Sequence, residues 1–135
     1  MALGMNGLKW ASTVFRERPV VCVAGNHEYY GKALPHLTKK PRESCKGKSV
    51  RFLECESVSI NGIRFLGCTL WSDFEVAGNK PPSIDAAQNM MTDYKRIHVS
   101  PQYRKLRPID TGAIHAASVK WLEECLLKSN VPTVV

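Results

Sequence analysis

The sequence lacks the features of a membrane or exported protein. No apolar run approaches the roughly 20 residues that a membrane-spanning helix needs. The segment from Met1 to Lys9 lacks the basic and apolar regions of a secretory signal. We therefore expect a cytoplasmic protein without a membrane partner.

Paired cysteine motifs are also missing. The cysteines are odd in number and none forms a Cys-x-x-Cys pair; they are Cys22, Cys45, Cys55, Cys68 and Cys125. Isolated cysteines in apolar or helical patterns usually behave as small hydrophobic residues in a reducing compartment. This argues against a zinc or disulfide framework.

The composition and charge fit one ordinary domain that spans residues 1–135. The formal net charge is +7, from 19 Lys and Arg against 12 Asp and Glu. Such a charge favours an anionic partner, namely a phosphorylated substrate, nucleic acid or an acidic surface, although a solvated basic face needs no partner. Two basic clusters stand out: Lys39, Lys40, Arg42, Lys46, Lys48 and Arg51, and then Arg104, Lys105 and Arg107. Neither is interleaved with several aromatic residues, so support for nucleic-acid binding is weak.

Short apolar runs alternate with helical patterns, which predicts an α/β fold. Residues 20–24 form a β-branched run of the kind that is buried on both faces in a parallel sheet. The pair Asn61-Gly62 predicts a tight hairpin, because both central residues of that turn take a positive φ. We expect the remaining strands at 50–53, 57–60, 63–66 and 131–135. Helices are expected from Asn6 to before Pro19, within 30–49 together with a loop, at 84–97, and from a cap at Asp110 or Thr111 to Leu126.

The motif Gly25-Asn26-His27-Glu28 follows the first of these strands directly. In open α/β sheets, sites assemble at the carboxyl ends of strands. Gly25 permits a tight turn, and the side-chain oxygen of Asn26 is a neutral, hard ligand for a divalent cation. His27 can donate a proton or hold a phosphate oxygen, while Glu28 either orients it or caps a following helix. An Asn-His pair in a turn can also simply satisfy backbone groups.

Other polar and aromatic residues are weaker candidates. Tyr29 and Tyr30 either contact a substrate or wedge the loop, and we expect Trp71 to pack and Asp73 to serve a turn or cap, although both could line a cleft. The remaining histidines are scattered without metal-ligand spacing and are expected at the surface or in helix packing; they are His36, His98 and His115.

Three segments resemble the calcineurin-like metallophosphoesterase family. The stretch ERPVVCVAGNHEYYG (residues 17–31) looks like the family block in which a strand leads into Gly-Asn-His-Asp/Glu. The stretch VRFLECESVSINGIRFLGCTLWSDF (50–74) resembles its strand-turn-strand segment. The helix HAASVKWLEECL (115–126) and the strand VPTVV (131–135) resemble the elements before its next histidine loop.

This resemblance implies a partial α-β-β-α sandwich and the hydrolysis of a phosphoester. The family uses a dinuclear centre of Mn, Fe, Zn or Mg ions that bind and activate a hydroxide. It implies that Asn26 is a metal ligand and that His27 is the catalytic residue, which contacts the phosphate or assists the leaving group.

Several family blocks have no counterpart here, namely Asp-x-His, Gly-Asp-x-x-Asp, a lone His and Gly-His-x-His. We therefore expect an incomplete domain, lacking parts at both ends, that does not hold two metals by itself. Exposed sheet edges would then favour self-association. The alternative is a catalytically inactive remnant of the fold that binds an anion or a protein.

Overall fold

A helix leads into the strand that carries the Gly-Asn-His-Glu motif. The computed structural model describes residues 4–35 and 39–135, so His36 lies outside the described residues. The first half contains α1 (Gly4–Val14), β1 (Val20–Cys22), the 3-10 turn η1 (Asn26–Tyr29), β2 (Ala33–Leu34), α2 (Lys39–Cys45), β3 (Val50–Phe52), β4 (Glu56–Ile60) and β5 (Ile63–Gly67). The second half contains α3 (Lys80–Met90), α4 (Asp93–Arg96), β6 (His98–Val99), β7 (Arg104–Lys105), α5 (Pro108–Leu127) and β8 (Thr133–Val134).

The strands form small sheets of mixed direction. β1 pairs with β3 in parallel, β5 pairs with β4 antiparallel and with β8 in parallel, and β6 lies between β2 and β7. The predicted hairpin is confirmed: Asn61 and Gly62 have φ values of 51° and 80°. The positive φ at both positions is what joins β4 to β5 over two residues.

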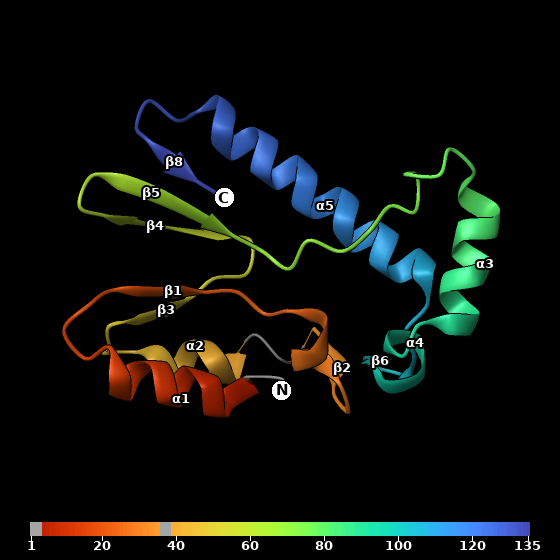
Figure 1. The fold of residues 1–135 in the computed structure, drawn as a ribbon, viewed down its shortest axis with the longest axis horizontal. Helices are drawn as coiled ribbons and strands as arrows, with labels where there is room; N and C mark the ends of the chain where they lie inside the picture. Colours follow the sequence, from red (N-terminus) through yellow and green to blue (C-terminus); the bar gives the residue numbers. More distant parts are fainter. Residues whose placement is uncertain (1–3, 36–38) are drawn as a thin grey trace.

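Helices cover the outer sides of the two main sheets (Figure 1). α1 contacts β1 and β3, and α2 packs on β3. On the other side of the β1–β3 pair lie β4, β5 and β8, with α5 beyond them, where the Arg64 guanidinium donates to the Cys125 carbonyl at 3.1 Å. The two sheets meet closely, because a Cβ added at Gly67 would lie only 2.6 Å from the Leu53 Cβ. The chain is therefore of the mixed α/β class.

The expected element boundaries need correction at several points. The helix predicted for 84–97 is two helices, because Met91 adopts an extended conformation with ψ of 133° between α3 and α4. α5 begins at Pro108, with Arg107 rather than Asp110 or Thr111 as its cap. β1 is only half-buried, so the prediction of a strand buried on both faces is wrong.

No helix within the described ranges has the length and apolar character needed to cross a bilayer. α5 is the longest of them, at 20 residues, and contains the charged residues Asp110, Lys120, Glu123 and Glu124.

Candidate functional site

The Gly-Asn-His-Glu motif forms a single 3-10 turn at the carboxyl end of β1. Glu28 caps this turn, because its Oε2 accepts a hydrogen bond of 2.8 Å from the Gly25 backbone amide. Gly25 has an ordinary extended φ of −89°, so a left-handed conformation does not explain the glycine. Instead, a Cβ at this position would lie 3.1 Å from Glu28 Oε2 and crowd the capping carboxylate. Glu28 therefore caps the turn of which it is itself a part, rather than a following helix as expected.

Asn26 is held by a residue far away in the sequence. Its Nδ2 donates a hydrogen bond of 2.6 Å to Oδ1 of Asp93, the first residue of α4. Asp93 is only 4% exposed, and a buried carboxylate needs such a donor. Because the amide nitrogen is fixed on Asp93, the amide oxygen of Asn26 points away from that carboxylate. This oxygen is the atom suited to a cation or to a hydrogen-bond donor.

His27 lies exposed beside an aromatic and cationic group. The centroid of its ring is 4.6 Å from that of the Tyr30 ring. The guanidinium of Arg96, the last residue of α4, lies 5.0 Å from the centroid of the Tyr30 ring. Partial burial and then the nearby Asp93 carboxylate raise the pKa of Tyr30, while Arg96 lowers it. Tyr30 therefore stays a neutral phenol at neutral pH, next to an imidazole that is open to solvent.

Tyr29 anchors the turn through a buried polar network. Its hydroxyl lies 3.0 Å from Thr69 Oγ1 and 3.2 Å from Glu54 Oε2. Thr69 in turn lies 2.5 Å from Glu54 Oε2 and 2.9 Å from the Ala24 carbonyl. Burial is the main cause that raises the pKa of Tyr29. Tyr29 is thus a wedge that ties the turn to the loops after β3 and β5.

His115, on α5, contacts the loop that follows β5. His115 Nδ1 lies 2.6 Å from the Trp71 carbonyl, which can only accept, so Nδ1 carries the proton. Its Nε2 lies 3.9 Å from Asp73 Oδ2. The Trp71 ring packs on Tyr29 with centroids 5.8 Å apart. Asp73 also accepts from the Glu75 amide, as expected for a turn residue, and this bond is the main cause that lowers its pKa.

The structure brings only part of the expected site together. Asn26 and His27 are neighbours on one turn, whereas His98 stacks on Tyr103 with centroids 4.3 Å apart. Asp93, Glu54, Thr69 and the fixed His115 were not singled out as site residues from the sequence. Glu54 and Thr69 share one signal with Asn26, because each follows the end of a strand.

The two basic clusters are partly neutralised by internal contacts. Arg42 pairs with Glu56 at 3.1 Å and also donates to the Glu54 carbonyl. Arg104 forms two hydrogen bonds with Asp110, of 2.6 and 2.8 Å. These arginines are therefore less available to an external anion than their sequence positions suggest.

A dinuclear metal centre does not fit the donors found here. Over residues 4–35 and 39–135, no three His, Cys, Asp or Glu side chains come together in a way that could hold a metal ion. Asn26 contributes one neutral oxygen, and the Asp93 carboxylate beside it already accepts a hydrogen bond from the Asn26 amide nitrogen. Hard divalent cations need several oxygen ligands, so the described residues do not form such a centre.

Comparison of the chain with protein-family models, with curated proteins and with solved structures found no match.

Proposed function

We propose that this chain supplies the Asn-His part of the active site of a metal-dependent phosphoester hydrolase of the calcineurin-like type. The observation that carries the proposal is the geometry of Asn26. Asp93 fixes its amide nitrogen at 2.6 Å and leaves its oxygen directed elsewhere, at the carboxyl end of a parallel strand. In that role Asn26 is one neutral ligand, and the other metal ligands come from outside the described residues.

His27 is the catalytic residue in this proposal. Its exposed imidazole lies one residue from Asn26 and can hold a phosphate oxygen or give a proton to the leaving oxygen. The order of layers also supports the proposal: Figure 1 shows helices, the β1–β3 pair, the β4–β5–β8 sheet and then α5. That order is the one that the resemblance implies for a partial α-β-β-α sandwich.

The alternative is a non-catalytic module that binds an anion or a protein through the basic residues around α2. The ion pair between Arg42 and Glu56 weakens this alternative, because it already neutralises one of these basic side chains. Nucleic-acid binding would use the same residues and would predict an affinity that falls steeply with salt, without any dependence on a divalent metal.

A titration with Mn²⁺, followed by NMR of the ¹⁵N-labelled chain, tests the metal role of Asn26. The paramagnetic ion should broaden the Asn26 side-chain amide and the His27 signals first. Asn89 is the matched control, because its Nδ2 also donates to a carboxylate, that of Asp85, at 3.2 Å on the exposed face of α3. Asn26→Ala should abolish the broadening around η1, while Asn89→Ala should leave it unchanged.

Hydrolysis of a chromogenic phosphodiester by the same samples tests the chemistry. Any Mn²⁺-dependent turnover should fall at least about tenfold, or about 1.4 kcal/mol, in Asn26→Ala and His27→Ala. Broadening confined to surface carboxylates, with none around η1, would contradict the proposal and favour the inactive remnant. Thermal melts of each variant separate loss of binding from loss of folding.

A further inference from the structure

The outer edge of β1 is open. β1 bonds to β3 through the Val20 amide, which donates to the Ser49 carbonyl at 3.0 Å, and through the Cys22 carbonyl, which accepts from Leu53 at 2.9 Å. In a parallel pair, alternate residues bond to the same neighbour, so Val21 and Val23 turn their backbone groups to the other side. Among the residues that the structure describes, no strand pairs with β1 there.

Beyond its shortness and the Pro19 that precedes it, this edge carries no device against pairing. Residues 20–24 contain no charged side chain and no proline, and most of them are valine. Edge strands in soluble proteins are normally guarded by a lysine, a proline, a bulge or a covering element. An unguarded run of β-branched residues is therefore a ready template for another strand.

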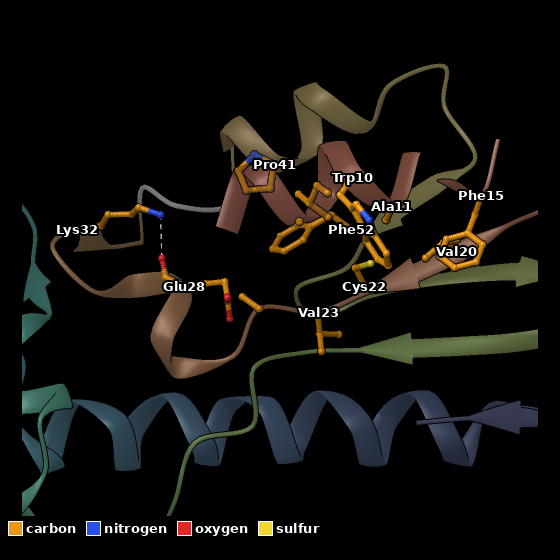
Figure 2. A pocket seen from close by; sticks show the side chains of 13 residues that line it. Trp10, Ala11, Phe15, Val20, Cys22, Val23, Glu28, Lys32, Pro41 and Phe52 are labelled. Atoms are coloured by element: carbon orange, nitrogen blue, oxygen red, sulfur yellow. Dashed lines mark hydrogen bonds between the residues drawn. The ribbon is translucent and has the colours of Figure 1, made fainter. Parts of the chain in front are cut away.

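An apolar pocket lies beside the same edge. This cavity of about 240 Å³ is lined by residues of α1 and β1, and Val23 also belongs to its lining. Figure 2 shows Val20 and Cys22 on the strand side and Trp10 on the helix side. Large side chains around it remain open to solvent: Trp10 is 56% exposed and Val23 51%. The polar groups of its lining, Glu28 and Lys32, lie together at one end, joined by the hydrogen bond from Lys32 Nζ to the Glu28 carbonyl.

We propose that β1 is a self-association site at which two copies of this chain pair their β1 strands antiparallel about a two-fold axis. The charges at the two ends of the strand favour this occupant: Arg16, Glu17 and Arg18 give a net charge of +1 before β1, and Glu28 follows it. Antiparallel pairing places the basic end of each copy beside the acidic end of the other. Parallel pairing of two copies would place like charges together.

The strand geometry fixes the register. With the axis at Cys22, Val21 of each copy faces the second copy's Val23, and these outward-facing residues exchange backbone hydrogen bonds. A two-fold contact of this kind is self-complementary, so it closes at the dimer. It produces a continuous sheet in the order β3–β1–β1–β3 and covers the open side of the pocket around Trp10. The contact does not use Asn26 or His27 of the proposed phosphoester site.

Sedimentation analysis of the purified chain over a range of concentrations tests the association. We expect a dimer, and we expect Val23→Lys to weaken it at least tenfold because the lysine places a charge on the paired edge. Val76→Lys is the matched control, since Val76 is fully exposed in the loop before α3. A wild-type chain that stays monomeric throughout, or a folded Val23→Lys variant that dimerises as before, would overturn the proposal.

Oxidative cross-linking tests the register without relying on a destabilising variant. The two Cys22 residues would form a non-hydrogen-bonded pair with Cα atoms about 4.5 Å apart, within the span of about 4.4–6.8 Å that a disulfide bridges. Diamide would oxidise the two thiols, taking up their two electrons and two protons. Burial raises the pKa of the Cys22 thiol, so the reaction is run at mildly alkaline pH.

Peptide mapping of the oxidised dimer should show the Cys22–Cys22 link, and Cys22→Ser should remove it. Cys55→Ser controls for the exposed thiol of Cys55, which is outside the proposed contact. A cross-linked dimer that joins other cysteines but not Cys22 would exclude this register.

Discussion

Removing the Thr69 hydroxyl should cost more stability than any comparable change on the surface. Thr69 is 7% exposed, and its Oγ1 lies within hydrogen-bond distance of Glu54 Oε2, the Ala24 carbonyl and the Tyr29 hydroxyl. Valine has almost the same size and shape, so Thr69→Val removes these contacts without leaving a large cavity. The turn that carries Asn26 rests on this network.

The expected loss of stability depends on which hydrogen bonds the partners of Thr69 keep in the variant. The 2.5 Å contact to Glu54 has the length of a charge-assisted bond, and a net loss of about 1.5–3 kcal/mol is typical for such a bond. In the variant, Glu54 Oε1 still accepts a hydrogen bond of 3.1 Å from the backbone amide of residue 69, and the Tyr29 hydroxyl still donates to Glu54 Oε2 at 3.2 Å. The hydroxyl has one proton, which it donates either to Glu54 or to the Ala24 carbonyl, so only one of these two bonds is counted. We expect the free energy of unfolding to fall by about 1.5–3 kcal/mol.

Urea unfolding followed by circular dichroism measures this change. Thr13→Val is the matched control, because the Thr13 hydroxyl also bonds a backbone carbonyl, that of Lys9, but does so at an exposed position on α1. Its effect should stay within about 0.5 kcal/mol. If Thr69→Val destabilises the chain no more than Thr13→Val does, the network does not hold the turn and the reasoning fails.

Two further predictions concern α5 and the contact between the sheets. The hydrogen bond from Arg104, and then the Arg107 backbone amide, lower the pKa of Asp110, so its contribution to stability exists above its unfolded pKa of about 3.9 and disappears as the pH falls below it. Asp110→Asn should therefore lower the melting temperature at pH 7, and a difference that persists unchanged at pH 2 would refute this. Gly67→Ala should destabilise the chain by about 1–3 kcal/mol because its Cβ would lie 2.6 Å from the Leu53 Cβ. Gly112→Ala, where a Cβ meets nothing within 4 Å in α5, should instead stabilise it by up to about 1 kcal/mol in the same urea assay, and equal signs for the two variants would contradict the packing argument.

The features that local chemistry determines could be predicted from the sequence. The Asn61-Gly62 turn needed only the rule that both residues take a positive φ, and the hairpin formed where it was expected. The position of the Gly-Asn-His-Glu motif after a strand followed from the β-branched run before it. α5 also carried a usable signal that the interpretation missed: Pro108 at its first turn and Asp110 closing the capping box mark a start three or four residues earlier.

The partners of the site residues could not be predicted, because they are contributed by distant segments. Asn26 and Asp93 are 67 positions apart, and Thr69 and Ala24 are 45 apart. The periodicity of residues 84–97 suited one helix, but the chain breaks at Met91 and both Asp93 and Tyr94 become buried. That burial is a tertiary effect, and helix propensity is too weak to oppose it.

Buried polar groups explain why this turn has one conformation rather than several. Two buried or half-buried carboxylates hold η1, Asp93 through Asn26 and Glu54 through Tyr29. Leaving either carboxylate without its donors would cost far more than a surface hydrogen bond returns, so the turn cannot rotate without breaking both contacts. The orientation of the Asn26 oxygen is therefore set before any ligand arrives. The described residues do not supply the further His, Cys, Asp or Glu ligands that a metal ion would need beside it. A turn fixed in this way suits a site whose other ligands are supplied by a separate segment, because only the incoming segment then has to be ordered on binding.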